Sequence, residues 1–278
     1  MTATRTFSAF DESLSVVRAG RGSVRFFDVC IDNIDGKTAL DYVEAFVRER
    51  RGKAKSVVFA NVHTIHLARK DVSFKTAVNT ADLVLPDGSG LAIAGRLFAN
   101  PIRENLNGTD FTPKVLAMAE EFGWSVYLFG SQQKIVTTCE RRIQRQFPRL
   151  KIAGATGGFI RKEEEQNLIN EINERKPDIL LVGLGSPRQE LWIAKNKRLL
   201  DVSICMAVGG LFDFLAERFP RAPQWMRRLG IEWIYRFLLD PKTKWDRVFI
   251  EIPKFLCLVV LNAPLARYRT RTPSIKHS

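Results

Sequence analysis

The strongest constraint on the fold is an alternation of two kinds of segment. Six short runs rich in apolar and β-branched residues have strand length, and segments of helix length lie between them. Strands that are apolar along their whole length are typical of a parallel sheet covered by helices on both faces. We therefore predict a Rossmann-like α/β fold with a mostly parallel sheet. The predicted strands are 56–60, 82–85, 125–129, 151–155, 178–182 and 203–208, and the predicted helices are 38–50, 108–122, 132–147, 162–175 and 187–199.

The charge distribution divides the chain into a body and a basic end. Residues 218–278 contain 13 Lys and Arg against 4 Asp and Glu, a net charge of +9, whereas the other 217 residues contain 30 against 26, a net charge of +4. We interpret residues 1–21 as a flexible lead-in, 22–217 as the α/β body and 218–278 as a helical basic appendage. A basic segment of this kind attracts nucleic acid, anionic lipid or a phosphorylated substrate.

The hydropathy of the sequence indicates whether any segment could span or contact a membrane. No run reaches the ~18–20 apolar residues that a membrane span needs, and the nearest candidate, 248–265, is interrupted by Glu251, Pro253 and Lys254. This segment is either a packed C-terminal element or an interfacial one, and the basic residues around it slightly favour the membrane surface. The four cysteines form no CxxC pair and the N-terminus has no continuous apolar stretch, so we expect reduced thiols in a cytoplasmic protein.

Polar and glycine residues gather directly after four of the predicted strands. Asn61 follows the first, and the segments 86–90, 183–190 and 209–213 follow three others. The carboxyl ends of parallel strands meet at one edge of a sheet, which is where such folds bind ligands. The glycines of these loops allow close approach to a ligand and expose amide groups that suit phosphate. We therefore place the site at this edge.

Asp87 is the candidate with the clearest chemistry. It lies between Pro86 and Gly88, and Gly90 follows in the same predicted strand-to-helix loop. A carboxylate at this point could act as a general base on a hydroxyl group. The structural alternative is that Asp87 caps the next helix, and spacing alone favours that alternative because Asp is a preferred N-cap residue.

The loop after the fifth strand resembles a dinucleotide-binding loop only in part. In the run GLGSPR, Pro187 and Arg188 stand where the third glycine of the fingerprint should fall. Gln189 and Glu190 could cap the following helix or bind a base or sugar, and the sequence leaves both possibilities open. Asn107 begins the run NGTD, which a turn with a helix cap explains.

Metal ligands are poorly represented in the chain. His63 and His66 are three residues apart and have no matching third ligand, so we interpret them as packing or hydrogen-bonding residues. No Asp-x-Asp pair occurs, which removes the short motif that commonly holds a divalent ion in sugar-nucleotide enzymes. We expect neither a metal nor a cofactor.

The appendage presents arginines beside tryptophans. Glu232 and Arg236 are four residues apart on a predicted helix, which is compatible with a surface ion pair. Alternatively, Arg236 joins Arg221, Arg227 and Arg228 in a clamp for a pyrophosphate group, since the guanidinium fork suits phosphate oxygens. The sequence by itself does not separate these alternatives.

Together, these motifs resemble the WecG/TagA/CpsF family of bacterial glycosyltransferases (glycosyltransferase family 26). The resemblance runs from about Phe27 to about Arg247, and its order and spacing make it specific. It rests on LPDGSG at 85–90, NGTD at 107–110, VGLGSPRQE at 182–190, GGLFD at 209–213, RAPQW at 221–225 and EWIYR at 232–236.

The resemblance implies an inverting, metal-independent transfer of a sugar from a UDP-sugar to a polyprenyl-pyrophosphate-linked saccharide, in surface or exopolysaccharide biosynthesis. Such an enzyme is peripheral on the inner face of the bacterial cytoplasmic membrane, and members of the family often self-associate. Asp87 is then the general base, Asn61 and Gln189 line the sugar or acceptor site, and the appendage arginines meet the acceptor pyrophosphate. The donor-binding residues would be Gly88, Gly90, Asn107, Gly183, Gly185, Glu190, Gly209, Gly210 and Asp213.

One position departs from the family pattern. Many members carry a threonine two residues before the asparagine that follows the first long strand, and here that position is Phe59. Because buried polar contacts set sugar specificity, the donor sugar stays open between N-acetylmannosamine, glucose and a uronic acid.

The sequence disfavours two other functions. The nearly neutral charge of the body disfavours a nucleic-acid binder, and the missing third glycine disfavours an NAD-dependent dehydrogenase.

Overall fold

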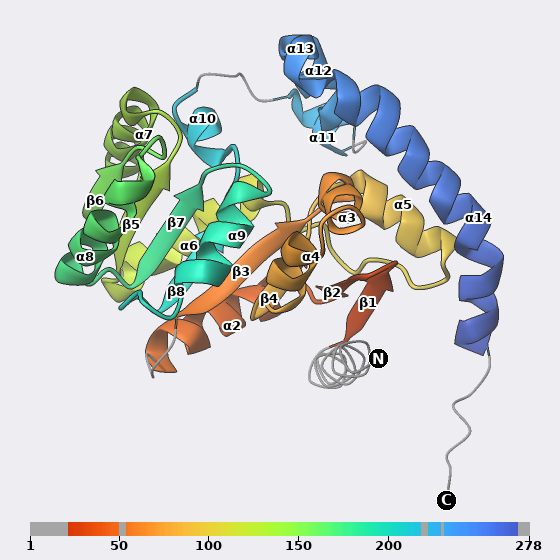
Figure 1. The fold of residues 1–278 in the computed structure, drawn as a ribbon, viewed down its shortest axis with the longest axis horizontal. Helices are drawn as coiled ribbons and strands as arrows, with labels where there is room; N and C mark the ends of the chain where they lie inside the picture. Colours follow the sequence, from red (N-terminus) through yellow and green to blue (C-terminus); the bar gives the residue numbers. More distant parts are fainter. Residues whose placement is uncertain (1–21, 50–53, 218–221, 229–230, 272–278) are drawn as a thin grey trace, which may run out of the picture.

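The computed structural model describes residues 22–49, 54–217, 222–228 and 231–271, and it confirms the predicted α/β fold (Figure 1). Six strands form one sheet in the order β4-β3-β8-β7-β5-β6, and every neighbouring pair in it is parallel. The central strands are buried along their length, as their apolar runs require. Their bounds are β3 Lys55–Ala60, β4 Leu83–Pro86, β5 Ser125–Gly130, β6 Lys151–Thr156, β7 Ile179–Gly183 and β8 Ile204–Ala207.

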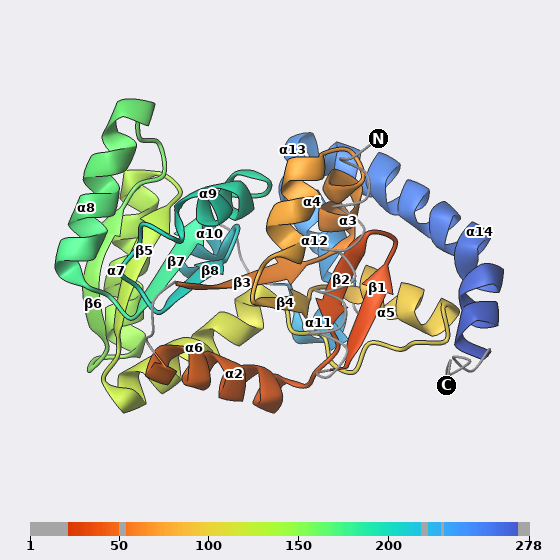
Figure 2. The ribbon, with the colours of Figure 1, turned by 60° about the horizontal axis from the view of Figure 1, so that its bottom comes forward.

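Helices cover both faces of this sheet (Figure 2). Each helix buries an apolar stripe; in α7, for example, Val136, Cys139 and Ile143 are buried at helical spacing. One face carries α3 (Val62–Ala68), α4 (Val72–Asn79), α5 (Ser89–Leu97), α8 (Glu165–Arg175) and α9 (Arg188–Asn196). The other carries α2 (Gly36–Glu49), α6 (Gly108–Phe122), α7 (Gln133–Gln146) and α10 (Leu211–Leu215). A short 3-10 turn, η1 (Lys162–Glu164), begins the segment predicted as one helix over 162–175.

The structure also contains elements that the sequence patterns did not predict. A hairpin of β1 (Ser23–Phe26) and β2 (Val29–Asp32) lies beside the edge strand β4, where the backbone N–H of Val84 donates to Oδ2 of Asp32 at 2.7 Å. The helices α3, α4 and α5 were also missed. These elements are short, so their periodicity was too weak to separate them from loops.

The C-terminal segment is helical and packs on the body. The appendage contains α11 (Gln224–Arg228), α12 (Glu232–Leu239), α13 (Pro241–Asp246), a π-helical turn η2 (Arg247–Glu251) and α14 (Ile252–Arg271). In Figure 1 α14 runs along α5, which it contacts, and its residues Phe255, Val259 and Ala263 join the core of the body. The opposite side of α14 exposes Val260 and Leu261. No helix within the described ranges combines the length and the apolar character that a bilayer crossing demands.

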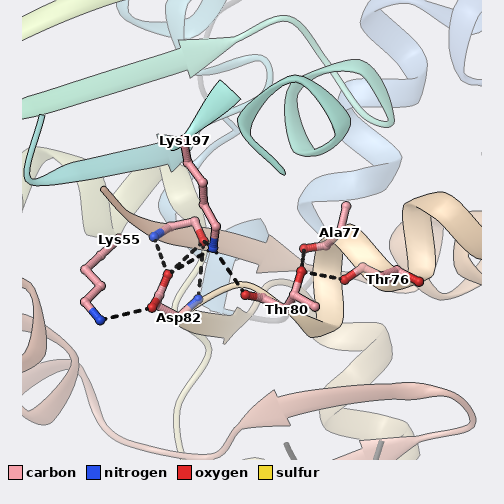
Figure 3. A network of polar contacts seen from close by, with 7 residues as sticks. Lys55, Thr76, Ala77, Thr80, Asp82 and Lys197 are labelled. Carbon is pink, nitrogen blue, oxygen red and sulfur yellow. Dashed lines mark hydrogen bonds and ion pairs between the residues drawn. The ribbon is translucent and has the colours of Figure 1, made fainter. Parts of the chain in front are cut away.

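Polar networks close the amino ends of the strands (Figure 3). Oδ2 of Asp82 accepts hydrogen bonds from the N–H and hydroxyl of Ser56 at 2.9 and 3.1 Å, and Asp178 holds Ser125 in the same way at 2.8 and 3.0 Å. The ammonium group of Lys197 lies 3.4 Å from Asp82. Burial would raise the pKa of Asp82, but Lys197 and the Ser56 hydrogen bonds outweigh burial and lower it.

Candidate active site

A cavity of about 400 Å³ opens at the carboxyl edge of the sheet, where the body meets the appendage. Loops that follow β4 and β8 and the start of α6 form one wall, and segments from α12 to α14 form the other. The cavity therefore lies at the edge that the sequence predicted, and both parts of the chain build it. Its lining residues are Asp87, Gly88, Ser89, Asn105, Asn107, Thr109, Asp110, Gly210, Glu232, Trp233, Arg247, Val248 and Ile252.

Asp87 is held at the cavity by the strand pairing that precedes it. Its backbone N–H donates to the carbonyl of Ala60 at 2.7 Å, which continues the pairing of β3 and β4 by one residue. Nδ2 of Asn61 donates to Oδ2 of Asp87 at 3.1 Å. The N-cap of α5 is Gly88, with φ of 99°, and no side chain caps that helix. The helix-cap alternative for Asp87 is therefore wrong, and its carboxylate lines the cavity instead.

Asn61 is oriented by the helix that it caps. Its Oδ1 accepts the backbone N–H of Thr64 at 3.1 Å, and the hydroxyl of Thr64 accepts the backbone N–H of Asn61 at 3.1 Å. This reciprocal capping box fixes the amide so that its N–H group points to Asp87. Because the amide group is planar, the bonds that fix its oxygen also fix the direction of the N–H group that donates to Asp87.

Gln189 ties together the glycine loops after β7 and β8. Its Oε1 accepts the backbone N–H groups of Gly185 at 3.2 Å and Gly209 at 2.9 Å. Both glycines have positive φ, 76° and 56°, which other residues rarely adopt. The Gln189 side chain is buried and lies outside the cavity lining, so the contacts that the structure gives it are with the loops.

Glu190 is a buried carboxyl group behind the same loops. It is 2% exposed, and its Oε1 accepts hydrogen bonds from the hydroxyl of Ser186 at 2.7 Å and from Nε2 of Gln189 at 2.9 Å. Its Oε2 has no hydrogen-bond partner in the part of the chain that the structure describes. Burial raises the pKa of the Glu190 carboxyl, although the bonds from Ser186 and Gln189 act in the opposite direction.

Three of the predicted donor-binding residues line the cavity: Gly88, Asn107 and Gly210. The side chain of Asn107 caps α6, since its Oδ1 accepts the backbone N–H of Asp110 at 2.9 Å. The N–H of Gly88 donates to Oδ1 of Asn105 at 2.7 Å, so a residue that sequence reasoning missed fixes the loop after Asp87.

Other predicted donor-binding residues have packing environments. A side chain at Gly90 would meet Val62, which allows α5 to approach α3 closely. A side chain at Gly183 would meet the ring of Phe212. Asp213 lies in the first turn of α10 and is not among the residues that line the cavity.

The predicted arginine clamp stays a prediction. Arg221 lies outside the described residues, and the structure describes the backbone, not the side chains, of Arg227, Arg228 and Arg236 in α11 and α12. Arg247, which was not among the predicted site residues, does line the cavity. Arg247 lies at the end of the resembling region, and the high positive charge of the appendage was the one sequence signal that pointed to it.

The two histidines lie on α3. His63 is hydrogen-bonded to Glu251, which confirms that it is a hydrogen-bonding residue. Among the residues with described positions, no group of three or more His, Cys, Asp and Glu side chains could hold a metal ion.

Comparison with known sequences decides the family. The sequence pattern of the Glycosyl transferase WecG/TagA/CpsF family matches residues 24–270. The protein belongs to this family. The match confirms the resemblance and extends it past residue 247 into α14, so the family pattern includes the helix that packs on the body. Neither nucleic-acid binding nor dehydrogenase activity gains support from this family.

Curated relatives are similar over most of their length. The chain is 29% identical over 222 residues to a protein of Bacillus subtilis strain 168, covering 80% of this chain and 84% of the relative. It is 27% identical over 241 residues to a protein of Staphylococcus aureus strain NCTC 8325, covering 86% and 92%. Both relatives are named N-acetylglucosaminyldiphosphoundecaprenol N-acetyl-beta-D-mannosaminyltransferase.

Proposed function

We propose that this protein is an inverting, metal-independent glycosyltransferase that moves a sugar from a UDP-sugar to a polyprenyl-pyrophosphate-linked saccharide. The observation that carries the proposal is the cavity in which Asp87, oriented by Asn61, lies opposite a wall that contains Arg247. A base and a cation in one cavity suit an acceptor that has both a hydroxyl and a diphosphate. The names of the relatives support this acceptor class.

The proposed chemistry is a single displacement. Asp87 accepts the proton of the acceptor hydroxyl as that oxygen attacks the anomeric carbon, and UDP leaves with the bonding electron pair. The leaving group gains negative charge, which backbone amides of the loop at Gly210 and the N-terminus of α6 are suited to stabilise. Attack from the side opposite the leaving group inverts the anomeric centre.

The exposed side of the appendage supports a peripheral position on the membrane. Phe237, Trp245 and Phe249 form an aromatic cluster, with ring centroids of Trp245 and Phe249 4.2 Å apart, and the last two are more than half exposed. Aromatic side chains suit the boundary between lipid and water. A cluster next to the cavity would bring a lipid-linked acceptor to the site from an anionic inner membrane face.

Point substitutions test membrane binding better than truncation, because α14 is part of the core. Trp245→Glu and Phe249→Glu should abolish flotation with anionic liposomes while the circular dichroism spectrum is unchanged. Val72→Glu replaces an exposed apolar residue on α4 and should float as the unmodified protein does. Equal flotation of all three variants would refute the membrane proposal.

The central test is turnover of a panel of donors on a synthetic polyprenyl-pyrophosphate-linked sugar. The panel contains the UDP forms of N-acetylmannosamine, N-acetylglucosamine, glucose and a uronic acid. Phe59 is the residue expected to affect which donor sugar is used. Its buried ring packs edge-on against Phe111, with centroids 6.0 Å apart, and against Gly108 at the start of α6. It supplies apolar support beside Asn107 and no hydroxyl. Turnover with none of the donors would contradict the proposed function.

A further inference from the structure

A pair formed by a buried carboxylate and a partly exposed histidine joins α3 of the body to the appendage. Nδ1 of His63 lies 2.7 and 3.0 Å from the two carboxylate oxygens of Glu251, a residue 188 positions away that is 7% exposed. Removing a carboxylate from water is costly unless a partner replaces the lost hydration. The burial of Glu251 therefore depends on His63.

On the body side, the pair is close to the proposed base. His63 is the second residue of α3, two positions after Asn61. Asn61 caps this same helical turn and donates to Asp87. Because the turn is held by the capping box with Thr64, a shift of His63 would also move the amide that orients Asp87.

On the appendage side, the pair is close to the cationic wall. Glu251 is the last residue of η2, and the first two residues of that turn, Arg247 and Val248, line the cavity. Ile252, which begins α14, lines it as well. Since a helical turn moves as a unit, the position of Glu251 determines where Arg247 lies.

Several other charges act on this pair. His66 on α3 and Arg247 on the appendage act on Glu251, whereas Lys70, which follows α3, and Lys254 act on His66. Burial would raise the pKa of Glu251, but the hydrogen bond and charge of His63, with His66 and Arg247, outweigh burial and lower it. Glu251 is therefore ionised at neutral pH and remains an acceptor for His63.

We propose that His63 and Glu251 are positioning residues for sugar transfer, which hold the Arg247 turn of the appendage against the Asn61–Asp87 pair. This inference rests on the proposed function. Neither side chain lines the cavity, so both act through residues that do. We assign the acceptor to the Arg247 wall because Arg247 lies two residues before Phe249 of the exposed aromatic cluster that is proposed to meet the lipid, and the acceptor's diphosphate suits a guanidinium group.

The test compares full-length variants in steady-state kinetics with a synthetic polyprenyl-pyrophosphate-linked sugar. His63→Ala and Glu251→Ala should lower acceptor kcat/KM roughly 10- to 100-fold, mainly through the acceptor KM, because the two walls lose their register. The double variant should be no worse than the single ones, since both changes break one unit. Glu251→Gln keeps an acceptor for the His63 N–H and should recover part of the loss. Glu164→Gln, which changes an exposed ion pair with Arg161, is the matched control and should have no effect.

Hydrogen exchange gives a readout that does not depend on activity. Amides of residues 247–256 should exchange faster in His63→Ala than in the unmodified protein, while those of β3 and β7 should be unchanged. Folded variants with the acceptor KM and exchange of the unmodified protein would overturn the inference. If the unmodified protein transfers no sugar, the proposed function fails, and the exchange result still decides whether the pair holds the appendage.

Discussion

The two edges of the sheet use the same residue types in opposite ways. At the amino edge, Asp82 and Asp178 are each saturated by a serine at the start of the neighbouring strand, and Asp82 has Lys197 as well. At the carboxyl edge, the side-chain hydrogen bond that Asp87 receives from within the described ranges comes from Asn61, and Asp87 lines a cavity. An aspartate enclosed by its own chain stabilises the fold, whereas one with a single orienting partner is available for a substrate.

The largest expected effect separates these roles at the carboxyl edge. Asp87→Asn should lower kcat by roughly 10²- to 10⁴-fold, the range expected when a general base is lost, with little change in melting temperature. Turnover on the lipid-linked acceptor measures it. Asp41→Asn, on the exposed side of α2, is the control and should be unaffected. Asp87→Asn activity near that of the unmodified protein would contradict the assignment of the base.

The matching change at the amino edge should do the reverse. Asp82→Ala removes the partner of Ser56 and Lys197 and should cost about 2 kcal/mol in the free energy of unfolding. Chemical denaturation measures this loss, and kcat of the folded fraction should be unchanged. A fall in kcat without a fall in the free energy of unfolding would show that Asp82 contributes to catalysis, so that the two edges do not have separate roles.

A smaller effect is expected where a loop needs a left-handed backbone. The methyl group that Gly185→Ala adds would have no atom within 4 Å. The substitution should therefore lower the free energy of unfolding only through the strain of a φ of 76°, by about 1 kcal/mol. The change should also raise the KM for the UDP-sugar, since this loop is proposed to bind the donor. Gly123→Ala, at the end of α6 with φ of 72°, should show the same strain and leave the donor KM alone.

The smallest effect is expected for Glu190→Gln. A folded-state pKa above the unfolded value means that the neutral acid is favoured, so its contribution to stability is present at low pH and is lost as pH rises through the folded pKa. Glutamine mimics the neutral acid, and the variant should therefore gain stability relative to the unmodified protein as pH rises above the usual glutamate value. Melting temperatures between pH 4 and 8 measure this difference, and the opposite trend would refute a raised pKa of Glu190.

The sequence predicted the elements that depend on contacts between residues close together in the chain. All six strands of the main sheet and the helices α6 and α7 were predicted within one or two residues, because their apolar patterns are local and strong. Helix α5 was missed because Gly90 and Gly95 weaken its helical pattern. These glycines are needed for close contact with Val62 and with the backbone near Asn100.

The candidate site divides in the same way. Asp87 and Asn61 were found because each directly follows a strand, and parallel topology brings such positions together. Asn105 and Arg247 were not, because they reach the cavity through contacts between segments far apart in the chain. The cap assigned to Asp87 from spacing was wrong because Gly88 takes that position.

The two hydrogen bonds of the Asn61 side chain restrict which residues could replace it. Its oxygen begins a helix and its nitrogen holds the proposed base. Serine, threonine or aspartate would supply the oxygen and lack the N–H group, whereas glutamine has both groups on a chain one carbon too long. Saturation mutagenesis should therefore leave asparagine as the single residue that supports full activity at this position.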